Sequence, residues 1–155
     1  MKLKQLTPVL FLIISSHAFA ASSHLVTFQN NAGGDVNVNY LKGHAYSKCV
    51  SYVDPAHLTI PMNAAKTSVF EDRDSRSCLN GNKRASWEII APNIDKIVIT
   101  LEHKKIGTRW RTFFSTEHGI VATPTKVYFD KLRYALDIKD INTITILKCT
   151  LPWQC

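Results

Sequence analysis

Long apolar runs, zinc-type cysteine pairs and helical periodicity are all missing from this 155-residue chain. No apolar run reaches the roughly 18 residues that a membrane-spanning helix needs, so no transmembrane segment is predicted. Four cysteines are too few for a miniature fold held together mainly by disulfides. Because 45% of the residues are hydrophobic and 20% are charged, the composition also excludes a disordered chain.

Several short motifs of catalysis and metal binding are absent as well. The sequence has no C-x2-C pair of the kind that binds zinc and no G-x-S-x-G nucleophile elbow. Asp72 and Asp74 are spaced like the first ligands of a calcium loop. However, Ser77 and Lys83 occupy the positions where that loop needs glycine and glutamate. We therefore predict neither a metal nor a cofactor.

The first 20 residues have the order of features found in a secretory signal peptide. Lys2 and Lys4 give a positive start, an apolar stretch follows over 9–14, and Ala18 and Ala20 frame a small-x-small cleavage site. Cleavage after Ala20 leaves residues 21–155. The 19 basic residues fall to 17 against 12 acidic ones, a net charge of +5. We expect a secreted or periplasmic protein with one domain over 21–155, exported by a bacterial pathway.

All four cysteines remain in the mature chain, which fits an oxidising compartment and structural disulfides. Four cysteines allow three pairings, and the sequence alone does not choose among them. Proximity favours Cys49 with Cys78 and Cys149 with Cys155. The second bridge would hold an otherwise free C-terminal end.

Alternation of apolar and polar residues is the main pattern of the mature chain. It is strict over residues 35–40 and looser over 25–30, which is typical of strands with one buried face. Between them, residues 31–34 include Gly33 and Gly34, and glycine readily adopts the positive φ of a turn. We predict a first hairpin here.

A second hairpin is predicted over residues 97–114. Apolar residues alternate on both sides of a four-residue connection, 104–107. This connection would set Leu101 opposite Trp110 and, on the other face, Glu102 opposite Arg109, so that hydrophobicity and charge agree across the pair.

More strands follow, separated by turn residues at intervals of roughly 10–15 residues. Residues 50–58 are ambiguous because Asp54-Pro55 interrupts them. The others are predicted at Thr67–Phe70, Arg84–Ile90, Thr125–Phe129, Leu132–Ile138 and Thr143–Cys149. The predicted fold class is all-β, a single-domain antiparallel β-sandwich of about eight or nine strands with two disulfides.

A small secreted hydrolase, of the phosphodiesterase or ribonuclease type, is one functional alternative. Its candidate residues would be Glu102, His103, Arg109, Arg111 and Glu117 or His118, which could share acid–base work and bind phosphate. However, Glu102 and His103 are neighbours on a strand and point to opposite faces. We therefore assign no catalytic residue.

Positive charge is concentrated on the second hairpin, which predicts a cationic face that attracts anionic groups. The expected function is non-catalytic binding to a phospholipid headgroup, an acidic glycan or an acidic protein, as a secreted effector in bacterial virulence. Nucleic acid is the least favoured partner, and a structural or adhesive module is a second alternative. The predicted binding residues are Lys96, Lys104, Lys105, Arg109, Arg111 and Phe113.

Overall fold

The computed structural model of the chain describes most of the mature sequence. The described residues are 22–43, 45–73, 75, 78, 81–92, 96–117, 119–151 and 154–155. The signal peptide predicted over 1–20 lies outside them, as do His44, Asp74, Ser77 and His118. None of the described residues belongs to a helix able to cross a lipid bilayer.

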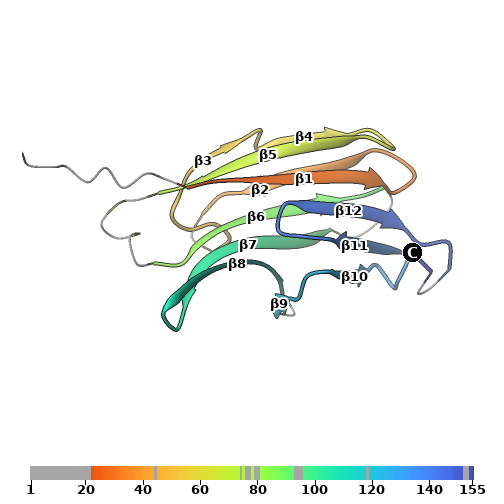
Figure 1. Cartoon of the computed structure of the whole chain (residues 1–155). Coiled ribbons are helices and arrows are strands. Elements are labelled where there is room, and N and C mark those ends of the chain that lie inside the picture. Colours follow the sequence, from red (N-terminus) through yellow and green to blue (C-terminus); the bar gives the residue numbers. More distant parts are fainter. Residues whose placement is uncertain are drawn as a thin grey trace, which may run out of the picture.

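Twelve strands form two six-stranded sheets (Figure 1). The first sheet has the spatial order β10 (Thr125–Phe129), β11 (Tyr134–Ile138), β12 (Thr143–Lys148), β1 (Ser23–Asn31), β5 (Ala65–Asp72) and β3 (Val50–Asp54). The second has the order β4 (His57–Ile60), β2 (Val36–Leu41), β6 (Lys83–Ile90), β7 (Ile97–Ile106), β8 (Arg109–Thr116) and β9 (Gly119–Val121). The all-β class is confirmed.

The number of strands exceeds the eight or nine predicted. The ambiguous stretch 50–58 contains two strands, β3 and β4, which belong to different sheets and are separated by Pro55 and Ala56. β9 has only three residues, too few to show an alternating pattern. One pairing also differs in direction, because β1 and β12 run parallel while the other strand pairs of the two sheets are antiparallel.

The predicted first hairpin is wrong. β1 pairs with β5 and β12 in the first sheet, whereas β2 pairs with β4 and β6 in the second. Residues 32–35 therefore carry the chain from one sheet to the other. Alternation marks one buried face on each strand, but two strands that face the same core from opposite sheets satisfy it equally well.

Asn30 organises this crossover with a fully buried side chain. Its Nδ2 donates 2.7 Å hydrogen bonds to the carbonyls of Gly34 and Ile60, and its Oδ1 accepts one from the amide of Ala32. Gly33 supplies the positive φ, +81°, that lets the chain turn here. One side chain thus satisfies three backbone groups from the crossover and from the end of β4.

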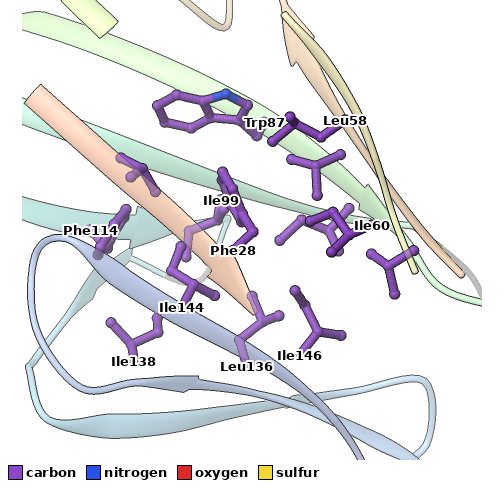
Figure 2. Close-up of a cluster of buried hydrophobic side chains, with 14 of the residues drawn as sticks. Phe28, Leu58, Ile60, Trp87, Ile99, Phe114, Leu136, Ile138, Ile144 and Ile146 are labelled. Carbon is purple, nitrogen blue, oxygen red and sulfur yellow. The ribbon is translucent and has the colours of Figure 1, made fainter. Parts of the chain in front are cut away.

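Side chains from both sheets meet in one core, which makes the arrangement sandwich-like (Figure 2). The large, almost fully buried members include Phe28, Leu136, Ile138, Ile144 and Ile146 from the first sheet and Trp87, Ile89, Ile99 and Phe114 from the second. The indole of Trp87 meets the rings of Phe28 and Phe70 edge-on across the layers, with centroids 5.8 and 6.5 Å apart. Ala85, Trp87 and Ile89 alternate along β6 and are all buried in this core.

Both proposed disulfides are present. Cys49–Cys78 links the residue before β3, in the first sheet, to the segment that leads into β6, in the second. Cys149–Cys155 closes the C-terminal end of the chain just after β12. Choosing the nearest partners in sequence gave the correct pairing.

Replacing Asn30 by alanine should strongly destabilise the fold. Asn30→Ala removes the hydrogen-bond partner of two buried backbone groups, the amide of Ala32 and the carbonyl of Ile60, and of the part-buried carbonyl of Gly34. At about 1–3 kcal/mol for each buried group, we expect the free energy of unfolding to fall by about 2 kcal/mol or more. Urea unfolding followed by circular dichroism would measure this loss. Asn31→Ala, at the exposed neighbouring position, is the matched control and should change stability by less than about 0.5 kcal/mol. Equal losses in the two variants would contradict this role of Asn30.

Candidate functional site

The turn between β7 and β8 extends beyond its neighbouring strands. β6 pairs with β7 only as far as His103, and β9 pairs with β8 only over Phe114–Thr116. Within the described part of the chain, residues 104–111 therefore pair only with each other, as a two-stranded ribbon that stands apart at the lower left of Figure 1. We call residues 104–111 the basic ribbon.

The register of this hairpin differs from the prediction by four residues. Its turn is Gly107-Thr108, with Gly107 at φ +63°, and Leu101 lies opposite Phe114 while Trp110 lies opposite Lys105. The predicted pairing of Leu101 with Trp110 is therefore wrong. Because strand side chains alternate with period two, a shift of four residues leaves every side chain on its predicted face.

Four cations and no acid occur in the eight residues of the basic ribbon. Lys104, Arg109 and Arg111 lie on the face turned away from the core, and Phe113 continues that face, whereas Lys105 lies on the opposite one. Lys105, Arg109 and Arg111 are exposed, and none of them forms an ion pair within the described part of the chain. Four of the predicted binding cations are thus brought together.

The remaining predicted residues have defined neighbours. The ammonium of Lys104 lies 3.5 Å from the Glu102 carboxylate and 4.9 Å from the ring centroid of Phe113. Phe113 lies opposite Glu102 in the register. Lys96 precedes the other end of β7 and pairs with Glu88 at 2.8 Å, so the structure places it away from the basic ribbon.

Two further cations join the outer face beside the ribbon. Arg84 lies opposite Glu102 on β6, and Lys48 forms a backbone bridge with Arg84. The guanidinium of Arg84 donates to the carbonyl of Ala45 at 3.0 Å. The alternation in β6 could have predicted that Arg84 points outward. Lys48 reaches this face through its backbone bridge to Arg84, which no local pattern indicates.

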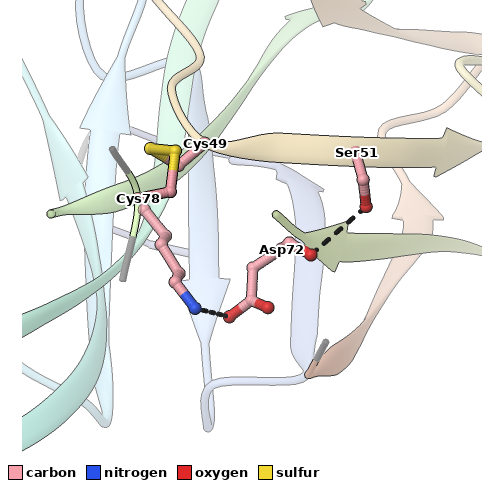
Figure 3. The surroundings of a disulfide bond; sticks show 5 residues. Cys49, Ser51, Asp72 and Cys78 are labelled. Atoms are coloured by element: carbon pink, nitrogen blue, oxygen red, sulfur yellow. Dashed lines mark hydrogen bonds and ion pairs between the residues drawn. A yellow bond between two sulfur atoms is a disulfide. The ribbon is translucent and has the colours of Figure 1, made fainter. Parts of the chain in front are cut away.

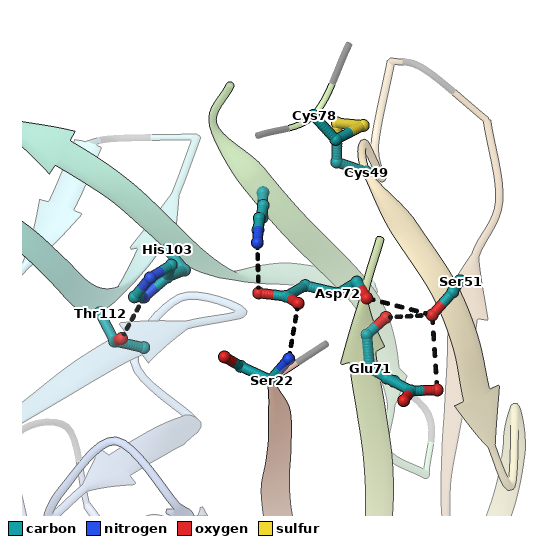
Figure 4. Close-up of polar contacts among 9 residues, drawn as sticks. Ser22, Cys49, Ser51, Glu71, Asp72, Cys78, His103 and Thr112 are labelled. Carbon is teal, nitrogen blue, oxygen red and sulfur yellow. Dashed lines mark hydrogen bonds and ion pairs between the residues drawn. A yellow bond between two sulfur atoms is a disulfide. The ribbon is translucent and has the colours of Figure 1, made fainter. Parts of the chain in front are cut away.

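A buried ion pair lies at the base of the ribbon. The ammonium of Lys83, on β6, is 2.8 Å from the carboxylate of Asp72, on β5, and the two side chains are only 8% and 1% exposed. The second oxygen of Asp72 accepts a 2.8 Å hydrogen bond from the amide of Ser22 (Figure 4). The contact joins the two sheets near Cys49–Cys78 (Figure 3).

Two histidines lie beside this ion pair. The ring of His24 stacks on Phe70 with centroids 4.9 Å apart and lies 5.6 Å from the ring of His103. His103 in turn stacks on Trp110 of the basic ribbon, with centroids 4.9 Å apart and nearly parallel planes. Its Nδ1 shares a 2.8 Å hydrogen bond with the hydroxyl of Thr112 (Figure 4). We call His24, Asp72, Lys83 and His103 the buried polar cluster.

Burial lowers the pKa of both histidines. For His24, desolvation is the largest cause, followed by the nearby His103, while Asp72 opposes the shift and Lys83 adds to it. For His103, desolvation again comes first, with Asp72 opposing and Lys83 adding to the effect. Both rings are therefore favoured in the neutral form near pH 7.

The other titratable candidates lie apart from this cluster. His57, on β4, hydrogen-bonds to Asn39 at 3.1 Å in a different part of the second sheet. Glu102 accepts a hydrogen bond from Ser115 on the outer face, opposite to His103, as strand geometry predicts. Among the described residues, no group of three or more His, Cys, Asp or Glu side chains is arranged to hold a metal ion.

Removing one member of the ion pair should be costly. Asp72→Asn leaves the ammonium of Lys83 buried without its counter-charge, so we expect the free energy of unfolding to fall by about 3–5 kcal/mol. The double variant Asp72→Leu with Lys83→Met removes both charges and should lose less than Asp72→Asn. Asp35→Asn, at an exposed position, is the control. Chemical unfolding measures all three, and a loss below about 0.5 kcal/mol in Asp72→Asn would overturn this account.

Acid should destabilise the protein through the two histidines. Because their folded pKa values lie below the unfolded value of about 6.5, the stability they support is complete above pH 6.5. It is lost as the pH falls through the lowered values. His24→Phe keeps a ring against Phe70 and removes one titration, so its free energy of unfolding should decline less between pH 7 and pH 5. Unfolding at pH 8, where both proteins are uncharged at this position, provides the reference. Parallel declines for the two proteins would contradict the assignment.

Comparisons with protein-family models and with curated proteins do not indicate a function for this site. No protein-family model matches the chain, and no curated protein matches it in sequence. The function must therefore be inferred from the geometry of the basic ribbon and the buried polar cluster.

Proposed function

We propose that the chain is a secreted or periplasmic β-sandwich protein, with its domain over residues 21–155, that acts by binding an anionic surface through the basic ribbon. One observation carries the proposal. Four cations and no acid lie on a ribbon that projects past its neighbouring strands, so a surface can approach it without meeting the rest of the sheet.

Electrostatic attraction supplies the binding energy in this proposal. Each Lys or Arg near an anionic surface is worth about 1 kcal/mol, so the four ribbon cations give about 4 kcal/mol at low salt. Arg84 and Lys48 extend the positive field along the outer face, and Glu102 offsets part of it. Because the Debye length is about 8 Å at physiological salt, only groups close to the ribbon contribute strongly.

Lys96 contributes little in this scheme because it is already paired with Glu88 beyond the other end of β7. Phe113 supports the site mainly as the ring beneath the ammonium of Lys104. The proposed binding surface is therefore narrower than the span from Lys96 to Arg111 that the sequence suggested.

A hydrolase based on histidine remains the alternative, since His24 and His103 do come together beside Lys83. The stacking argues against it. Phe70 and Trp110 each cover one face of these rings, and Nε2 of His24 is buried, with no hydrogen-bond partner among the described residues. A histidine that acts as a general acid or base needs a ring nitrogen within hydrogen-bond reach of the substrate, and burial keeps this nitrogen from it. Phosphodiesterase activity that disappears in His24→Phe would favour the alternative.

Neutralising the arginines of the ribbon should weaken binding. Arg109→Gln with Arg111→Gln removes two cations, and at about 1 kcal/mol each the affinity for anionic vesicles or heparin should fall about 30-fold at low salt. The measurements are vesicle co-sedimentation and the salt concentration that elutes the protein from heparin.

Lys66→Gln with Lys148→Gln is the matched control. Lys66 on β5 and Lys148 on β12 are exposed, and they lie at the end of the first sheet opposite to Asp72. The control therefore removes the same charge, but far from the basic ribbon. Its affinity should change by less than about threefold. Equal effects of the two double variants would mean that net charge, and not the basic ribbon, governs binding.

A further inference from the structure

The basic ribbon also exposes two large apolar side chains. Ile106 is 42% exposed and Trp110 is 38% exposed, and they flank the turn Gly107-Thr108 on its two sides. Each is next to a cation in the sequence, since Lys105 precedes Ile106, and Arg109 and Arg111 enclose Trp110. Apolar and basic groups thus share the same projecting end.

The two apolar side chains lie on opposite faces of the ribbon. Ile106 pairs with Arg109 on the outer face, and Trp110 pairs with Lys105 on the other. A flat anionic partner laid against one face would leave one of them in water. A partner that receives the ribbon by its tip would cover both at once.

Trp110 is held in position before any partner arrives. Its ring stacks on His103, and the ammonium of Lys83 lies 6.0 Å from its centroid. These contacts hold the indole on the inner face of the basic ribbon while part of its surface stays exposed. A preordered side chain loses less conformational freedom on binding than a mobile one.

We propose that the anionic partner is a phospholipid bilayer and that the tip of the basic ribbon enters its interface with Ile106 and Trp110. This inference rests on the proposed anion binding and names its partner. Tryptophan favours the level of the headgroups, and Lys and Arg can bury their stems while their charges stay among the phosphates. A polyanionic glycan would use the four cations but would leave Ile106 in water.

The decisive experiment compares the purified protein on two anionic probes, which are vesicles of phosphatidylcholine with about 30% phosphatidylserine and immobilised heparin. Ile106→Ser should weaken vesicle binding at least fivefold and leave heparin elution unchanged. Trp110→Gln also removes the stack on His103 and should weaken vesicle binding at least fivefold. Ile106 lies beside the turn and outside the core, so Ile106→Ser should keep the fold, as a thermal melt would check.

Two controls sharpen the result. Ile120→Ser removes a still more exposed isoleucine, at 64%, from β9 outside the ribbon and should bind vesicles like the parent. The emission of tryptophan should shift to the blue on vesicles and be quenched by brominated lipid. If both effects are absent in Trp110→Gln, which keeps Trp87 and Trp153, they report on Trp110.

The outcomes separate the two proposals. If Arg109→Gln with Arg111→Gln weakens binding to both probes while Ile106→Ser and Trp110→Gln behave like the parent on vesicles, the bilayer inference is overturned and anion binding stands. Tight heparin binding without vesicle binding would also overturn the bilayer inference, and it would favour an acidic glycan as the anionic partner. If the arginine variant binds both probes as the parent does, the proposed function itself fails.

Discussion

The buried contact between Asp72 and Lys83 is the interaction on which the end of the molecule with the basic ribbon depends. It joins β5 in one sheet to β6 in the other, and the amide of Ser22 occupies the second oxygen of the carboxylate. Desolvating two charges is expensive, so such a pair adds little net stability compared with apolar packing. The ion pair instead helps to fix how the two sheets are aligned, because the two charges must come to 2.8 Å from opposite sheets.

The position of the basic ribbon follows from this alignment. An isolated two-stranded ribbon is only marginally stable in water, so residues 104–111 need support from their base. The support comes through rings, since Trp110 stacks on His103, and His103 lies beside His24, which packs on Phe70. Lys83 lies near Trp110 as well as Asp72. A single connected set of contacts therefore runs from the junction of the two sheets to the surface proposed to bind.

Local pattern predicted some features well and others wrongly, for identifiable reasons. Alternation located most strands and the inward faces of β6 and β7, because period two reports directly on which side is buried. It could not choose the register of the β7–β8 hairpin, since shifts of four residues preserve faces. It also could not show that β1 and β2 lie in different sheets, and the buried side chain of Asn30 is the feature that makes this crossover possible.

The sequence by itself determined the all-β class and the concentration of cations near residue 105, because both depend on composition and short-range spacing. Spacing favoured the two disulfide pairings, and the structure decided them. Only the tertiary structure decided that those cations project on a ribbon, that Lys96 is paired elsewhere, and that His24, Asp72, Lys83 and His103 meet beneath it. These four residues come from β1, β5, β6 and β7, and the packing of the two sheets brings them together. These residues are far apart along the chain, so no local pattern predicts their contact. The contact arises because both sheets bury their inner faces in one core.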